Sequence, residues 1–147
     1  MKAWAAQESW VFAQGNPLSV ARPSDTCGHL RANEGLRRDE ALYSCDGRFR
    51  LYVQPDANVV LTRKPSEGQG TTAIWSTRPL VAGTDTTDLV LLMRGDGNLV
   101  VADNHPKVLW QTGTQGNPGL YLKLTDDGDL QVRSPSEIYW RTNTGGN

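Results

Sequence analysis

One stretch of the chain, QPDANVVLT, carries hydrogen-bonding side chains at alternate positions. Gln54, Asp56 and Asn58 are followed by Val60 and Thr62 at the same spacing. A carboxylate only accepts hydrogen bonds, whereas the two amides both donate and accept. Side by side, these groups suit a ligand with neighbouring hydroxyls, and the valine suits an apolar patch beside them. An exposed strand face is polar in any case, so an isolated Asp-x-Asn pair would indicate little.

The neighbouring residues place this polar row on a pair of β-strands. Successive side chains of an extended chain point to opposite faces, so alternate positions share a face. The odd-numbered positions are apolar or small: Phe49, Leu51, Val53, Pro55, Ala57, Val59 and Leu61. The pattern predicts a core face on one side and the polar row on the other.

The chain repeats this arrangement twice more, in residues 88–102 and 119–133. Each unit has an alternating strand, a tight turn with Asp, a second alternating strand, and a third strand that carries Trp75, Trp110 or Trp140. Copies about 30 to 40 residues apart indicate a repeat architecture. Since a single small sheet is unstable alone, three apolar faces are expected to bury one another around an axis. The sequence predicts an all-β, pseudo-threefold domain, with a conventional β-sandwich as the alternative.

Length and composition narrow the class of protein. The chain has 147 residues and a net charge of -1, so it is one domain in size and has no basic field for a nucleic acid. No apolar run approaches the roughly 18 residues of a membrane span. The first ten residues, MKAWAAQESW, lack the apolar core of a signal peptide, which indicates a cytosolic or an already mature chain.

Residues 1–30 lie outside the repeat pattern, so one domain over 1–147 is expected to consist of this extension and three repeats over 31–147. Trp4, Trp10 and Phe12 are apolar anchors, and residues 9–13 suit a short strand packed on or beside the domain. Cys27 and Cys45 could form one disulfide or remain two free buried thiols.

QPDANVVLT nearly matches Q-x-D-x-N-x-V-x-Y, the sugar-site signature of the bulb-type (monocot) mannose-binding lectins. The segments WQTGT and WRTNT resemble the closing W-x-T-x-T segments of that family, and the resemblance covers about residues 31–147. It implies a B-lectin domain with the β-prism II fold, in which three four-stranded antiparallel sheets are often dimerised by exchange of a C-terminal strand. It also implies non-catalytic recognition of mannose in glycans, without a metal or another cofactor.

The resemblance gives each position of the row a role. Asp56 and Asn58 would hold the axial 2-hydroxyl of mannose, Gln54 would hold the 3-hydroxyl, and Val60 would lie against the ring carbons. Thr62 stands where the family has the Tyr that reaches the 4-hydroxyl, and it is too short to do so without a water. A hydrogen bond contributes about 0.5–1.5 kcal/mol, so its loss weakens the site up to roughly tenfold.

The second repeat offers a possible second carbohydrate site with Arg94, Asp96, Asn98 and Val100. Arg94 replaces the family's Gln and has donors only, so pairing with Asp96 would block the pocket. In the third repeat the corresponding residues are Thr125, Asp127, Asp129, Gln131 and Arg133. This set lacks the amide donor and the apolar contact, so a structural role is expected there.

Other signals carry less weight. Arg94-Gly95-Asp96 spells an adhesive tripeptide but belongs to the repeat turn, and His29 and His105 have no partners at metal spacing. No residues in nucleophile–His–acid order indicate an enzyme. Since one weak site binds usefully only when several chains act together, a homodimer is expected. All three copies lack the Tyr, so a protein-interaction or toxin/bacteriocin-like module with decayed sugar sites remains the alternative function.

Overall fold

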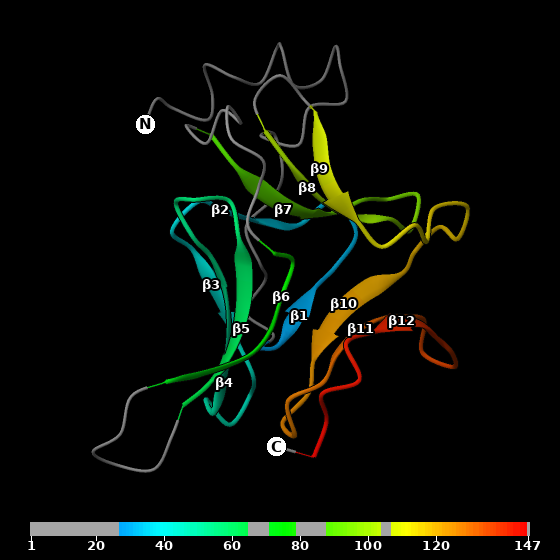
Figure 1. Ribbon diagram of the computed structural model, residues 1–147. Coiled ribbons are helices and arrows are strands. Elements are labelled where there is room, and N and C mark those ends of the chain that lie inside the picture. The colour runs from blue at the N-terminus through cyan, green and yellow to red at the C-terminus, as the bar shows by residue number, and fades with distance from the viewer. Residues whose placement is uncertain (1–26, 65–70, 79–87, 104–106, 147) are drawn as a thin grey trace.

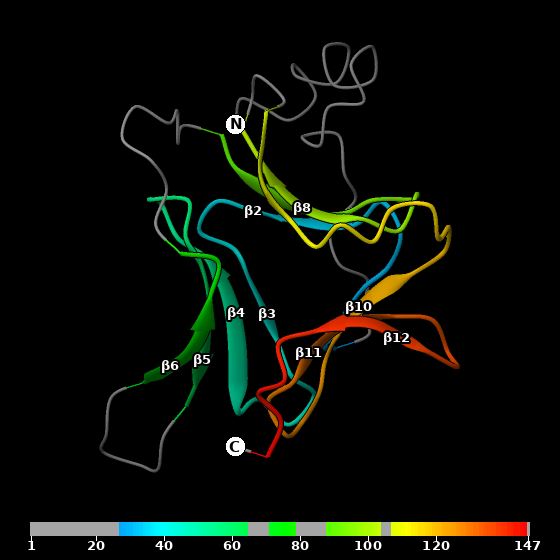
Figure 2. The same ribbon diagram turned by 45° about the vertical axis from the view of Figure 1, so that its right-hand side comes forward.

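The computed structural model describes residues 27–64, 71–78, 88–103 and 107–146. These residues form three separate four-stranded sheets, in which every pair of neighbouring strands is antiparallel. Figures 1 and 2 show the sheets as the three sides of a prism around a central axis. The predicted all-β fold with three four-stranded antiparallel sheets is therefore confirmed, and the β-sandwich alternative is wrong. The strand predicted at residues 9–13 lies outside the described residues.

Each sheet takes three of its strands from one repeat. The first-repeat sheet has the order β3-β4-β5-β6, with bounds Ala41–Tyr43, Phe49–Val53, Val59–Arg63 and Thr72–Ser76. The second-repeat sheet has the order β2-β7-β8-β9, with bounds Gly35–Arg37, Val90–Met93, Leu99–Ala102 and Val108–Gln111. The third-repeat sheet has the order β1-β10-β11-β12, with bounds His29–Leu30, Tyr121–Leu124, Leu130–Arg133 and Ile138–Arg141.

The predicted alternation holds within the strands and fails in the turn between them. Phe49, Leu51 and Val53 on β4 are fully buried, and so are Leu61 and Val59, which face Leu51 and Val53 on β5. The chain reverses after Val53, where Gln54 N donates to Asn58 O at 3.0 Å. Pro55, predicted on the core face, lies in this turn and is exposed, because a turn does not continue the two-residue period of the strands.

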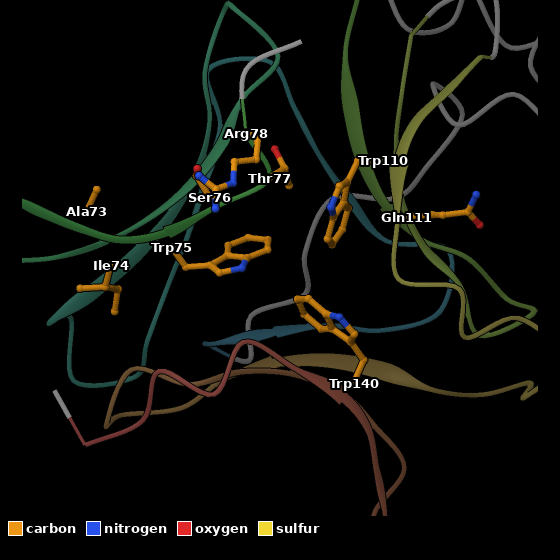
Figure 3. Close-up of a pocket in the computed structure, with 9 residues that line it drawn as sticks. All are labelled: Ala73, Ile74, Trp75, Ser76, Thr77, Arg78, Trp110, Gln111 and Trp140. Atoms are coloured by element: carbon orange, nitrogen blue, oxygen red, sulfur yellow. The ribbon is translucent and has the colours of Figure 1, made fainter. Parts of the chain in front are cut away.

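The inner faces of the three sheets share one hydrophobic core, made mostly of leucine and valine. Trp75 on β6, Trp110 on β9 and Trp140 on β12 pack against this core from the three sheets. Their ring centroids lie 5.6, 5.7 and 5.6 Å apart, and each pair is edge-to-face (Figure 3). Such aromatic pairs contribute about 0.5–1.5 kcal/mol beyond their buried area. The matched tryptophans thus join the three repeats.

The fourth strand of each sheet comes from one short segment, His29–Tyr43, which visits the three sheets in turn as β1, β2 and β3. Its buried hydrophobic side chains are Leu30, Leu36 and Leu42, six residues apart. The fold therefore includes His29 and Leu30, which the sequence pattern assigned to the N-terminal extension. This segment ties the repeats together, because each sheet contains one of its strands.

Two similar turns redirect this segment from one sheet to the next. Asn33 and Asp39 have positive φ of 70° and 71°, a conformation that Asn and Asp tolerate better than other non-glycine residues. Glu34 and Glu40 each accept a hydrogen bond at 2.8 Å from the backbone N–H three residues earlier. Cys27 and Cys45 are joined in a disulfide that closes the segment, which resolves the alternative left open by the sequence.

Candidate functional site

The polar row of the first repeat gathers at the turn between β4 and β5. Asp56 is exposed, and Gln54 and Asn58 are half-buried. The turn holds them together, because Asp56 Oδ1 accepts a hydrogen bond from Asn58 N at 3.0 Å and Gln54 N donates to Asn58 O. The structure therefore brings all three predicted hydrogen-bonding residues to one end of the first-repeat sheet.

Several polar atoms of this turn face no partner among the described residues. Asn58 Oδ1 accepts a hydrogen bond from Thr77 Oγ1 at 3.2 Å, whereas Asn58 Nδ2 donates to no described atom. Asp56 uses Oδ1 within the turn, and no described residue bonds its Oδ2. The side-chain amide of Gln54 likewise bonds no described group. A donor, an acceptor and a second amide are thus available to a ligand at one place.

Val60 and Thr62 lie on the same outer face but are nearly covered. Their side chains are 6% and 7% exposed, and the core cluster does not include them. Thr62 Oγ1 lies 3.5 Å from the carbonyl oxygen of Arg50 on the neighbouring strand. The sequence pattern predicted both residues at the ligand surface; the structure leaves them little surface with which to contact a ligand.

Two further residues of this face were missed in the sequence analysis. Arg50 and Tyr52 stand directly across from Thr62 and Val60 in the β4–β5 ladder. The Arg50 guanidinium lies over the Tyr52 ring at 4.7 Å, and the Tyr52 hydroxyl donates to Asp39 Oδ1 at 3.0 Å. The hydrogen bond to Asp39 raises the pKa of Tyr52. Arg50 and Tyr52 lie at even-numbered positions, like Gln54. The two-residue alternation therefore predicts them on the same face, and could have identified them.

The second repeat places its predicted residues in the same turn but uses their polar groups internally. Asn98 is 3% exposed, and its Oδ1 accepts from Thr112 Oγ1 and from the N–H groups of Gly113 and Thr114. Its Nδ2 donates to Gln111 Oε1 at 2.9 Å.

The rest of that possible second site is closed as well. Arg94 Nη2 pairs with Asp96 Oδ2 at 2.6 Å, the pairing that the sequence analysis considered. Val100 is only 1% exposed, so its side chain has almost no surface with which to contact a ligand. In the second repeat, contacts within the protein thus involve the Asp96 carboxylate, the Asn98 amide and the Val100 side chain.

The third repeat carries a buried carboxylate at the same position. Asp129 is 1% exposed; its Oδ2 accepts from Gln131 Nε2 at 3.0 Å and forms an ion pair with Arg141 at 2.6 Å. Burial raises the pKa of Asp129, but hydrogen bonds from Gln131, Thr144 N and Arg141 outweigh it and lower the pKa below its usual value. Both oxygens of this carboxylate are thus bonded within the third repeat.

All three repeats use one oxygen at this position to fasten the turn to the closing segment. In each repeat this oxygen accepts a hydrogen bond at 3.2 Å from a threonine hydroxyl two residues after the tryptophan. The acceptors are Asn58, Asn98 and Asp129, and the donors are Thr77, Thr112 and Thr142. One side-chain oxygen of Asn58, Asn98 and Asp129 therefore holds the turn to the closing segment in every repeat. The repeats differ in what the other polar atom of that side chain bonds.

The described residues also line a cavity of about 580 Å³ beside the tryptophans. It is lined by Trp75, Trp110 and Trp140 together with polar residues that include Ser76, Arg78 and Gln111. Figure 3 shows Gln111 directed away from the indole rings, and its Oε1 is the acceptor for Asn98.

Among the described ranges no group of His, Cys, Asp and Glu could hold a metal ion. The same ranges include no helix long and apolar enough to cross a membrane.

Three four-stranded sheets around a pseudo-threefold axis, with a tryptophan from each, define a β-prism II domain. No known family model matches the sequence. A B-type lectin of Scorpaena plumieri, plumieribetin, is 29% identical over 116 residues, which are 78% of this chain and 93% of that protein.

Two solved structures share both fold and sequence with this chain. A monomeric monocot mannose-binding lectin from Gastrodia elata has a TM-score of 0.64 and 26% identity, covering 82% of this chain and 99% of that one. The mannose-specific agglutinin of snowdrop, Galanthus nivalis, complexed with methyl-α-D-mannoside, has a TM-score of 0.58 and 28% identity, covering 80% and 96%. The resemblance to the bulb-type, or B-type, lectins is confirmed.

Proposed function

We propose that this chain is a lectin that binds mannose or mannose-containing glycans, without catalysis, through Gln54, Asp56 and Asn58 of the first repeat. The observation that supports this most directly is that Asn58 Nδ2 and Asp56 Oδ2, in the same turn, bond no described residue. A pyranose hydroxyl can donate to the carboxylate and accept from the amide at once. The likeness to the snowdrop agglutinin, whose structure was solved with a mannoside, supports the choice of sugar.

The second and third repeats contribute to folding in this proposal and not to binding. Their motif atoms are already bonded to Gln111, Arg94 and Arg141. Each chain therefore has one site, and a shallow site with a buried Thr62 is weak. Linked sites gain from effective concentration, so useful binding of glycans requires several chains presented together.

A homodimer would supply this multivalency. Each described sheet has its four strands from this one chain, with β12 paired to β11, so exchange of a C-terminal strand is not needed to complete a sheet. In this proposal the dimer forms through another surface. Sedimentation velocity over a range of protein concentrations tests this, and a single monomeric species at all concentrations contradicts it.

The sugar site is tested by titrating methyl-α-D-mannoside into the wild-type chain and following amide chemical shifts by NMR. Asp56→Ala removes the accepting carboxylate, and a hydrogen bond to a charged group contributes about 1.5–3 kcal/mol. We expect binding to weaken by about tenfold or more. Asp127→Ala changes the exposed carboxylate at the matching turn position of the third repeat and is expected to leave the titration unchanged. Indistinguishable titrations of wild type and Asp56→Ala would rule out this site, and the protein-interaction module would then be the better account.

A further inference from the structure

The outer face of the first-repeat sheet continues beyond the polar turn in two cross-strand rows. Tyr52 faces Val60 in the row next to the turn, and Arg50 faces Thr62 in the row after it. Rows on one face are about 7 Å apart, since a strand rises about 3.4 Å per residue. A glycan held at Gln54 and Asn58 that extends along β4 and β5 therefore passes over Tyr52 and then meets Arg50.

Arg50 is held in place but is chemically unsatisfied. Its guanidinium stacks on Tyr52 at 4.7 Å, and the Tyr52 hydroxyl is itself held by Asp39. Its Nε is buried and has no hydrogen-bond partner, and no ion pair with a described acid reaches its guanidinium. A buried donor without a partner costs about 1–3 kcal/mol, more for a charged group. The terminal Nη1 and Nη2 groups of Arg50 also bond no described residue, and an oriented guanidinium of this kind matches a planar or tetrahedral anion.

The corresponding positions in the other repeats do not reproduce this cation. By register, the second repeat has Val90 and Leu92, both buried, at the places of Arg50 and Tyr52. The third repeat has Tyr121 and Lys123 there. The stacked arginine thus occurs in the same repeat whose turn keeps its hydrogen-bonding groups free.

We propose that Arg50, stacked on Tyr52, extends the first-repeat site into a subsite for an anionic substituent of the bound glycan. The substituent is a uronic-acid carboxylate or a sulfate or phosphate ester, carried by the bound sugar. This inference depends on the proposed sugar site, because the neutral part of the glycan is held by Gln54, Asp56 and Asn58. Acidic glycans are then preferred over neutral mannosides.

The test compares dissociation constants by calorimetry in about 20 mM and about 500 mM NaCl. The probes are methyl-α-D-mannoside, D-mannuronate, the uncharged methyl ester of mannuronate, and mannose 6-sulfate. We expect mannuronate or the sulfate to bind about tenfold more tightly than the mannoside in low salt, and the ester to bind like the mannoside. The gain is expected to shrink in high salt because the added ions screen the charges. A gain for mannuronate alone identifies a carboxylate as the partner, and a gain for both identifies any small anion.

Three variants separate the subsite from general effects of charge or folding. Arg50→Gln is expected to remove the gain while leaving mannoside binding within about twofold, and Arg50→Lys is expected to keep part of it. Lys123→Gln removes one positive charge from the outer face of the third repeat and is expected to keep the whole gain. Near-ultraviolet circular dichroism of the tryptophans confirms that each variant is folded.

The outcomes also separate this inference from the proposed function. Equal affinity of wild type for charged and neutral probes, or an Arg50→Gln variant that keeps the gain, overturns the subsite and leaves the mannose site standing. Absence of binding for every probe overturns both.

Discussion

Asn98 donates a hydrogen bond from its Nδ2 to Gln111 Oε1 at 2.9 Å, a contact that has no counterpart at Asn58 among the described residues of the first repeat. In the first repeat Ser76 takes the place of Gln111, since Ser76 pairs with Val60 as Gln111 pairs with Val100. A serine at that position makes no described bond to Asn58. The Nδ2 of Asn58 therefore donates to no group in the described part of the chain, whereas that of Asn98 is bonded to Gln111.

Alanine substitution of these two asparagines is expected to have opposite consequences for stability and binding. Asn98→Ala leaves the N–H groups of Gly113 and Thr114 without their acceptor and should lower the free energy of unfolding by about 3 kcal/mol. Asn58→Ala removes one acceptor of the Thr77 hydroxyl and should cost about 1 kcal/mol while abolishing mannoside binding. Urea denaturation and sugar titration of both variants measure this, and equal losses of stability would contradict the difference in bonding.

Removing the Arg94–Asp96 ion pair is not expected to open a second sugar site. Arg94→Gln restores the residue type of the first repeat, but Asn98 stays buried and bonded, and Val100 stays covered. Calorimetric titration of this variant should give one site per chain, as in the wild type. The matched change in the first repeat, Gln54→Arg, places a cation beside the free Asp56 carboxylate and should weaken binding by about tenfold. A stoichiometry of two for Arg94→Gln would show that the ion pair alone closes the second repeat.

Asp129 makes stability depend on pH in the acid range. Its pKa in the folded state is lowered, so its contribution is fully present above the unfolded value of about 3.9 and is lost as the pH falls through the folded value. Asp129→Asn should lower the free energy of unfolding by about 1–3 kcal/mol at pH 7 and flatten its decline between about pH 5 and pH 3.

Urea denaturation at several pH values measures the slope. Asp127→Asn, in the exposed part of the same turn, is the charge-matched control and should keep the wild-type slope. If Asp129→Asn also keeps that slope, the carboxylate is not the group responsible.

The Cys27–Cys45 disulfide should stabilise all three sheets together. It closes a loop with a sequence separation of 18 that contains β1, β2 and β3, one strand of each sheet. Loops of this length correspond to about 3 kcal/mol in the chain-entropy model. Reduction, or Cys27→Ser with Cys45→Ser, should lower the midpoint of thermal unfolding. Amide exchange should then quicken in every sheet, and a change confined to the third-repeat sheet would contradict this coupling.

The sequence by itself determined the hairpins, the three repeats and the best-preserved polar turn. Alternation with a period of two is a local property of an extended chain, so Leu51 and Leu61 identify their strands without reference to distant residues. Trp75, Trp110 and Trp140 occupy equivalent places in the three repeats, and this is recognised from the repeat pattern of the sequence alone. The chemistry of Gln54, Asp56 and Asn58 is likewise carried by residue type and spacing.

The tertiary structure decided which strands complete the sheets and which polar atoms remain free. β1, β2 and β3 are two to three residues long, too short for alternation to be recognised, and the six-residue spacing of Leu30, Leu36 and Leu42 acquires a meaning only when three sheets meet. Asn98 bonds Gln111, and Arg50 stacks on Tyr52, only because these side chains meet once the strands have paired. The spacing of residues along the chain predicts on which face of a strand each side chain lies. Whether the hydrogen-bonding groups of that side chain are already paired depends on contacts between separate strands and turns.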